Sequence, residues 1–308
     1  MIKSNVIRVG SRGSALALRQ TEEALEQLRP SHPGVDFQVV TFQTSGDADQ
    51  TSPLAEMAPS IGQGVFVKEI EQELLNGNLD MAVHSLKDLP TVQPAGLVLG
   101  AVLKRQDARD VLVNRWDCSL DKLPQGARIG TSSPRRKAQL MDLCPQAEVL
   151  PMRGSVLTRL DKALSDDYDG AVLAAAGLVR LEQTGRVAEY LSAQEFVPPP
   201  GQGVLAVEIR DGDQDMRELL RPLEDSESRY AITAERAFLE KLGGGCTMPV
   251  GAFARSTGEN LLLTIFLASP DGKKCFRAKI LGLPHDPLQL AGDAYMALLE
   301  RGGRQLLG

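Results

Sequence analysis

The chain has 308 residues, of which 43% are hydrophobic and 24% are charged, as is ordinary for a soluble globular protein. Its net charge of −6 and its aromatic content of 4% argue against nucleic acid as a partner, because such partners call for basic patches and stacking rings. Single cores rarely grow past about 250–300 residues, so this length predicts more than one domain.

Membrane and metal functions are also disfavoured. No apolar run is long enough to span a bilayer, and the first five residues lack the apolar core of a signal peptide, so we expect a cytoplasmic protein without a membrane partner. The four cysteines form no CxxC pair, and the chain has only three histidines. This pattern predicts free thiols and no metal site.

The first hundred residues alternate between strand and helix patterns. Strands are predicted at residues 7–9, 35–42, 81–83 and 97–103, and helices at about 15–28 and 66–74, where apolar residues recur at helical spacing. Residues 44–64 form a Gly- and Pro-containing stretch that is long for a loop without secondary structure, and such loops are often functional lids or disordered.

The pattern restarts near residue 127. Further strands are predicted at residues 127–130, 148–152, 170–174 and 204–209, with helical segments between them. Alternating strands and helices favour a mainly parallel sheet with right-handed crossovers. The tail contains a helix at 226–241, strands at 261–267 and 274–281, and a helix at 287–301, which predicts a small α+β unit.

The fold class is therefore α/β, with two α/β domains and a small C-terminal α+β domain. The stiff and then flexible stretch from Pro198 to Gly203 suits a crossing between domains, after which we expect the chain to return to the first domain. We assign residues 1–103 with 204–221 to domain 1, residues 104–203 to domain 2 and residues 222–308 to domain 3.

Four polar side chains follow the buried strand at residues 81–83. They are His84, Ser85, Lys87 and Asp88. Buried charge is unfavourable unless paired, and open α/β folds place ligands at strand ends beside a cleft. The stretch alone permits two interpretations, a surface Lys-Asp pair or a functional cluster. His84 is explained equally well by packing and by catalysis.

Two strand-Gly-hydroxyl-helix turns resemble anion sites, because backbone N–H groups and hydroxyls converge at a helix start. The first turn contains Ser11 and Ser14, and the second contains Thr131, Ser132 and Ser133. Each hydroxyl is also explained by ordinary helix capping.

Arginines gather near the same strand ends and helix starts. The set comprises Arg12, Arg135, Arg136, Arg153, Arg159 and Arg180. Guanidinium groups match carboxylates with two parallel hydrogen bonds, so an acidic protein with this set is expected to bind several carboxylates or phosphates. The competing interpretation is that these arginines are solvated and scattered.

Cys246 follows three glycines, which allow close backbone approach and an adaptable loop. A lone cysteine is more often a small buried apolar residue. The context leaves a covalent role open.

Taken together, these motifs resemble the porphobilinogen deaminase (hydroxymethylbilane synthase) family over nearly the whole chain and in the family's order. The matching stretches are Ser11–Leu18, Phe66–Glu69, Ala82–Pro90, Gly130–Arg136, Arg153–Leu160, Leu173–Leu178, Pro200–Gly203, Thr233–Arg236 and Gly244–Gly251. The resemblance also implies that the first two domains are similar to two-lobed periplasmic binding proteins.

The resemblance implies a transferase of haem and porphyrin biosynthesis. It joins four porphobilinogen molecules head to tail, releases ammonia at each step and gives the linear tetrapyrrole hydroxymethylbilane. The growing oligopyrrole is primed by a dipyrromethane cofactor, attached by a thioether to the cysteine that matches Cys246. Asp88 matches the catalytic aspartate, which would stabilise the pyrrole cation left by ammonia loss. We expect a monomer.

The resemblance also assigns the remaining site residues. Those expected to contact the cofactor are Ser14, Lys87, Asp88, Thr131, Ser132, Ser133, Arg135, Arg136 and Ser155. Those expected to contact substrate are Arg12, Phe66, Ser85, Arg153, Arg159, Arg180 and Gln202.

One departure concerns the loop before Phe66. Bacterial members commonly carry a Lys-rich, Gly-rich lid there, whereas residues 56–64 contain no lysine, so a cationic lid is in doubt. Two alternatives are a two-lobed small-anion binding protein and an inactive tetrapyrrole-binding paralogue. The binding protein needs an export signal and has no use for Cys246, and intact Asp88 and Cys246 argue against the paralogue.

Overall fold

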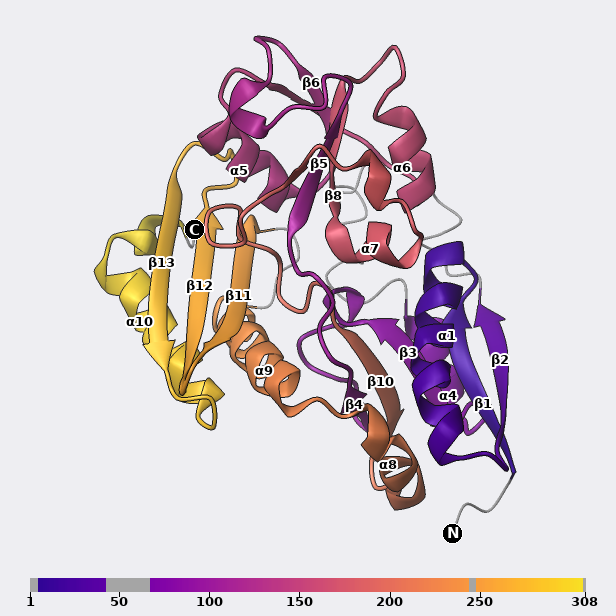
Figure 1. Cartoon of the computed structure of the whole chain (residues 1–308). Coiled ribbons are helices and arrows are strands. Elements are labelled where there is room, and N and C mark those ends of the chain that lie inside the picture. The colour runs from indigo at the N-terminus through magenta and orange to yellow at the C-terminus, as the bar shows by residue number, and fades with distance from the viewer. Residues whose placement is uncertain (1–4, 43–66, 244–247, 307–308) are drawn as a thin grey trace.

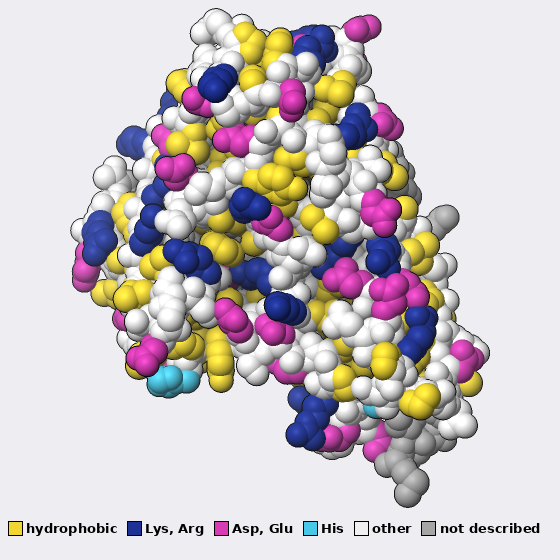
Figure 2. All heavy atoms as spheres, viewed as in Figure 1, with side chains coloured by type: hydrophobic (Ala, Val, Ile, Leu, Met, Phe, Trp, Pro, Cys, Tyr) yellow, Lys and Arg dark blue, Asp and Glu magenta, His cyan; other side chains and the backbone are white. Residues whose placement is uncertain are grey.

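The computed structural model describes residues 5–42, 67–243 and 248–306. These residues form two five-stranded sheets with flanking helices and one three-stranded sheet (Figure 1). None of the described helices is long and apolar enough to cross a bilayer. On the face shown in Figure 2, basic and acidic side chains are interspersed.

The first sheet has the strand order β2-β1-β3-β10-β4. Its strands are β1 (Val6–Arg12), β2 (Asp36–Phe42), β3 (Met81–Ser85), β4 (Leu97–Val102) and β10 (Leu205–Arg210). The helices α1 (Ala15–Leu28), α4 (Lys68–Leu75) and α8 (Gln214–Leu220) flank it. Leu25 and Leu28 of α1 are buried in its core beside Val9, as their helical spacing predicts. Met81 to Val83 of β3 are buried without alternation, which is typical of a strand covered on both faces.

The second sheet has the order β7-β6-β8-β5-β9. Its strands are β5 (Asp110–Asn114), β6 (Arg128–Gly130), β7 (Glu148–Leu150), β8 (Gly170–Ala174) and β9 (Glu189–Tyr190). Its helices are α5 (Pro134–Leu143), α6 (Val156–Lys162) and α7 (Ala175–Arg180). When the strand that follows a crossing (β10 or β5) is set aside, the other four strands of each sheet have the same order, 2-1-3-4 in chain order within the unit. The crossing strand lies in fourth place in both sheets.

The expectation of mainly parallel sheets is wrong at that fourth strand. β10 runs antiparallel to β3 and β4, and β5 runs antiparallel to β8 and β9. The other pairs, β1 with β2 and β3 and β6 with β7 and β8, are parallel. The exceptions arise because β5 and β10 each follow a crossing from the other sheet, so they enter from the opposite end.

The C-terminal unit is an antiparallel sheet of β11 (Val250–Thr257), β12 (Asn260–Ala268) and β13 (Cys275–Gly282). The helices α9 (Ser226–Lys241) and α10 (Pro287–Glu300) pack together on one face, and α5 contacts β12 on the other. The sequence pattern missed β5, β9 and β11. The expected α/β, α/β and α+β arrangement is confirmed by these three sheets.

The chain crosses between the first two sheets twice, once between β4 and β5 and once between β9 and β10. The two crossing segments lie side by side. Gln106 of one donates its backbone N–H to the Gly203 carbonyl of the other at 3.1 Å. Gly203 has φ +85°, and a Cβ there would lie 2.4 Å from the Gln106 carbonyl oxygen, so only glycine suits this approach.

One buried carboxylate of α9 binds both crossings. Glu235 accepts two hydrogen bonds of 2.8 Å from Arg105 of the first crossing and one of 2.8 Å from the Gly201 N–H of the second. It also accepts from the Ala254 N–H of β11. We therefore propose the three-domain division given above, supported by the strand membership of each sheet, with Glu235 at the junction of the three domains.

Candidate active site

A pocket of about 270 Å³ lies where the three units meet. The turn after β3 contributes Lys87, the start of α5 contributes Arg135 and Arg136, the second crossing contributes Gln202, and α9 contributes Arg236. Basic side chains from three separate units thus line one hollow of an acidic protein.

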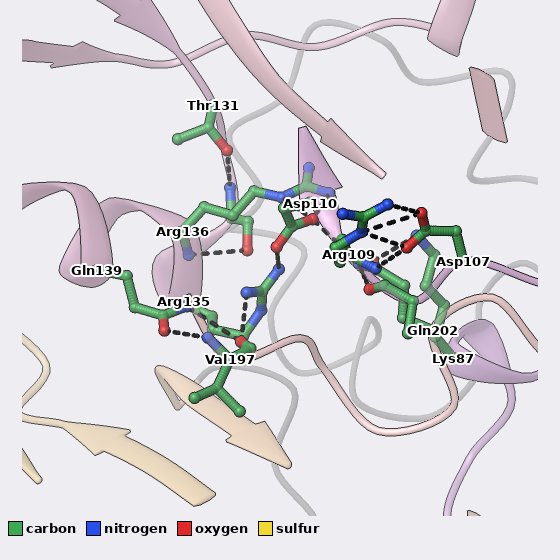
Figure 3. Close-up of polar contacts among 12 residues, drawn as sticks. Lys87, Asp107, Arg109, Asp110, Thr131, Arg135, Arg136, Gln139, Val197 and Gln202 are labelled. Carbon is green, nitrogen blue, oxygen red and sulfur yellow. Dashed lines mark hydrogen bonds and ion pairs between the residues drawn. The ribbon is translucent and has the colours of Figure 1, made fainter. Parts of the chain in front are cut away.

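Two of these arginines are held by a carboxylate beneath the pocket. Asp110, at the start of β5, is fully buried, and its two oxygens accept from Arg135 Nη2 and Arg136 Nη2, each at 2.7 Å (Figure 3). Burial alone would raise the pKa of Asp110, but the two guanidinium groups hold that pKa at about 2. Two arginines share one carboxylate, so the trio retains a net positive charge.

The same carboxylate is linked to Lys87 through Gln202. The Gln202 side chain donates to Asp110 Oδ1 at 3.0 Å, and its Oε1 accepts from Lys87 Nζ at 3.3 Å (Figure 3). Burial lowers the pKa of Lys87 to about 8, while the carboxylates of Asp88 and Asp110 oppose that shift. Near neutral pH Lys87 therefore remains mostly an ammonium suited to an anion.

Asp88 lies at the edge of this cluster and is exposed, in the 3₁₀ turn Leu86–Asp88 that follows β3. It does not line the pocket. Its charge acts on two predicted site residues, because it opposes the lowering of the pKa of Lys87 and of Arg159. Burial, with Arg136 and Arg153 nearby, lowers the pKa of Arg159 to about 10.

The predicted hydroxyl residues lie at turns and helix starts. Ser14, Ser133 and Ser155 are the N-caps of α1, α5 and α6, and each accepts a backbone N–H of its own helix. Thr131 Oγ1 accepts the Ser133 N–H, and Ser132 Oγ bonds the Met152 backbone. The capping interpretation accounts for these contacts, and each hydroxyl retains further hydrogen-bonding capacity.

Two predicted arginines lie away from the Asp110 group. Arg180, at the end of α7, donates to Glu23 of α1 at 2.7 Å and to the Gly203 carbonyl at 3.3 Å. In this structure its guanidinium therefore links the first two units. Arg12 ends β1 at the turn before α1.

The remaining predicted positions differ in what surrounds them. Ser85 ends β3 beside the site. His84 is buried with its Nε2 3.1 Å from Glu208 Oε2, which favours the packing interpretation over catalysis. Cys246, Phe66 and the loop at residues 56–64 lie outside the described residues. Within the described ranges, no group of three His, Cys, Asp or Glu side chains is arranged to hold a metal ion.

Sequence reasoning missed Asp110 and Arg236. The available signal for Asp110 was an acid at the head of the apolar run Val111–Val113, where a lone carboxylate is unfavourable without a partner. Arg236 was visible only as part of the Thr233–Arg236 motif.

Two family models match the chain. "Porphobilinogen deaminase, dipyromethane cofactor binding domain" matches residues 7–218, and "Porphobilinogen deaminase, C-terminal domain" matches residues 229–300. The porphobilinogen deaminase of Thermus thermophilus is 46% identical over 303 residues, covering 98% of each chain. That of Syntrophus aciditrophicus is 43% identical over 301 residues, covering 98% of this chain and 97% of the relative.

Solved structures with a similar fold include two binding proteins. The methionine binding protein MetQ has a TM-score of 0.43 and 14% identity, covering 78% of this chain and 96% of that one. The aliphatic sulphonate binding protein SsuA of Escherichia coli has a TM-score of 0.40 and 12% identity, covering 78% and 71%. Likeness at this level carries no information on function. The family models and the full-length relatives do, and the chain belongs to the porphobilinogen deaminase family.

Proposed function

We propose that the pocket between the Lys87 turn, α5 and α9 holds pyrrole carboxylates and that Asp88, at its edge, carries the chemistry. The chain is a transferase of tetrapyrrole biosynthesis with a dipyrromethane cofactor. It condenses four porphobilinogen molecules head to tail, with release of ammonia, to give hydroxymethylbilane.

The observation that carries the proposal is the charge of the pocket. Lys87, Arg135, Arg136 and Arg236 line it, while one carboxylate, Asp110, neutralises part of that charge from below. Each pyrrole unit brings an acetate and a propionate, so a growing chain accumulates carboxylates. Charge-assisted hydrogen bonds from guanidinium and ammonium groups are the strongest available partners for them.

The donor set fits the cofactor. When bound, dipyrromethane supplies the covalent primer on which the pyrrole chain is built. Lys87, Ser133, Arg135 and Arg136 are placed to hold its carboxylates, since all four line the pocket. We assign the attachment to Cys246 and supporting contacts to Ser14, Thr131, Ser132 and Ser155.

Asp88 is assigned to the reacting centre. Loss of ammonia from porphobilinogen leaves a methylene cation conjugated to the pyrrole nitrogen, and a carboxylate beside that nitrogen stabilises the positive charge and accepts its proton. Asp88 suits this role because it is exposed to an incoming substrate. Lys87 and Arg159 lie within its electrostatic reach and are assigned to orienting substrate carboxylates.

The other substrate contacts remain proposals. They comprise Arg12, Phe66, Ser85, Arg153, Arg180 and Gln202. Gln202 is supported by its place in the pocket wall. Arg180 would have to share its guanidinium between Glu23 and a substrate carboxylate. We also propose a monomeric, cytoplasmic protein.

The function is tested by incubating the purified chain with porphobilinogen and measuring ammonia and linear tetrapyrrole. We expect four ammonia molecules for each hydroxymethylbilane. Binding of porphobilinogen without ammonia release would instead indicate the non-catalytic paralogue.

Replacing Arg153 or Arg159 by alanine is expected to stall elongation at enzyme-bound intermediates. Arg159 lies near both Arg153 and Arg136 on the second unit, so loss of Arg153 or Arg159 removes a cation from a group that later pyrrole units need. Mass spectrometry of enzyme mixed with limiting porphobilinogen should show intermediates that wild type does not accumulate. Replacing Arg115, a partly exposed arginine of the same unit paired with Asp169, should change nothing. Normal elongation in both variants would show that Arg153 and Arg159 are surface residues without a role in binding the growing chain.

Replacing Asp110 by asparagine is expected to destabilise the protein by about 3–5 kcal/mol, because it leaves two buried guanidinium groups without a counter-charge. The pKa of Asp110 is about 2 in the folded protein, against about 3.9 when unfolded, so its stabilisation is complete above pH 4 and lost toward pH 2. Urea unfolding at pH 7 and pH 3 should show the difference from wild type shrinking at the lower pH.

The Asp110 variant also has an expected kinetic signature. Asp110 raises the pKa of Lys87, so removing its charge lowers that pKa below about 8, and the alkaline fall in activity should move to lower pH. The matched control is Asp169→Asn, because Asp169 pairs with surface Arg128 and Arg115; its alkaline limb should match that of wild type. An unchanged alkaline limb in the Asp110 variant would contradict the coupling.

A further inference from the structure

Arg236 reaches from the C-terminal unit to the segment that follows Asp88. It lies on α9, and its Nη2 donates to the backbone carbonyls of Pro90 and Thr91, the latter at 2.9 Å. The same nitrogen lies 3.4 Å from Gln93 Oε1. One guanidinium nitrogen therefore ties the Asp88 turn to α9.

The rest of the guanidinium is uncommitted among the described residues. Arg236 Nε and Nη1 donate no hydrogen bond to a described residue. The carboxylates of Glu208 and Glu240 act on the guanidinium electrostatically and raise its pKa against the effect of burial, but neither accepts a hydrogen bond from it. The neighbouring Glu208 is reached only through Gln93, whose amide donates to Glu208 Oε1 at 3.2 Å. Arg135 and Arg136 differ from Arg236 in that both are anchored on Asp110.

This arginine also lines the pocket. Burial lowers its pKa to about 10, so it remains charged at neutral pH. A partly buried cation with acidic neighbours but no direct ion pair is incompletely compensated, and the guanidinium borders the pocket. Nε and Nη1 therefore remain available to an anion that enters the pocket.

We infer that Arg236 binds a carboxylate of the pyrrole chain with its remaining N–H groups while its Nη2 holds the turn that carries Asp88. This inference rests on the proposed function. A carboxylate in the pocket then fixes the guanidinium, and the guanidinium fixes the backbone two and three residues beyond Asp88. Arg236 is thus a binding residue for the pyrrole chain and a positioning residue for the catalytic carboxylate.

The test compares Arg236→Gln and Arg236→Lys with Arg229→Gln. Arg229 is the matched control because it lies two turns earlier on α9 and pairs with Glu224 at the surface. Four quantities are measured for each: the fraction of purified protein that carries the covalent cofactor by intact mass, KM for porphobilinogen, kcat, and the melting temperature.

Arg236→Gln should reduce cofactor loading and raise KM about 10–100-fold in the loaded fraction, which corresponds to one lost charge-assisted hydrogen bond. Arg236→Lys keeps the positive charge but lacks the several N–H donors of a guanidinium group. It should therefore restore cofactor loading and bring KM close to the wild-type value. Its kcat should stay below that of wild type, since one ammonium cannot hold both backbone carbonyls and a carboxylate. Arg229→Gln should match wild type.

Loading and KM at wild-type values in Arg236→Gln would overturn the inference, even with a lowered melting temperature, because only a structural role would then remain. If Arg236→Gln does not fold, Arg236→Lys decides, and an unchanged kcat in that variant overturns the positioning role. Absence of turnover in wild type would instead reject the proposed function.

Discussion

Asp88→Asn is expected to lower kcat for porphobilinogen by about 10²–10⁴-fold, the range typical of losing a general acid–base group. Asparagine keeps the size and the polarity of the side chain but carries no negative charge to stabilise the pyrrole cation and cannot take its proton. Because Asp88 is exposed in a 3₁₀ turn, the substitution removes no buried contact, and the melting temperature should stay near that of wild type.

The measurement is single-turnover release of ammonia from cofactor-loaded protein, with loading verified by intact mass. Asp121→Asn is the matched control, because Asp121 is also an exposed aspartate in a short 3₁₀ turn but lies on the second unit. It should retain wild-type kcat. A loaded Asp88→Asn enzyme within a few-fold of wild type would remove Asp88 from the catalytic role.

Local patterns predicted most of the elements well. α9 begins at Ser226 and ends at Lys241, as the apolar spacing indicated, and Pro134 is the first residue of α5 behind the Ser133 cap. These features depend on residues within one or two helical turns. Strand direction depends on where the chain re-enters a sheet, so the antiparallel β5 and β10 were not predictable from alternation.

The site was only half predictable for a related reason. The sequence predicts that basic residues gather at strand ends, but it does not predict which acidic residues they pair with. Arg135 meets Asp110 because β5, β8 and β6 are neighbours in the second sheet, and Arg180 meets Glu23 because α7 packs on α1. Pairs 25 and 157 residues apart leave no periodic signal. Arg236 similarly becomes informative only when the fold brings α9 to the Pro90 carbonyl.

Cys246→Ser is expected to abolish both cofactor attachment and tetrapyrrole formation. We assign the thioether to Cys246, and serine offers a much weaker nucleophile than a thiolate for attaching the primer. Without the primer, the pocket cations still bind pyrrole carboxylates, but no covalent chain can grow on the protein. The control is Cys275→Ser, because Cys275 is a partly buried free cysteine of the same unit, on β13.

We propose that this chain builds its product on a cofactor held covalently at Cys246. Intact mass of the purified, active protein tests it most directly. We expect a mass above that of the 308-residue chain by one dipyrromethane unit, with the excess present in Cys275→Ser and absent in Cys246→Ser. Active protein with the bare sequence mass, or an excess that persists in Cys246→Ser, would contradict it.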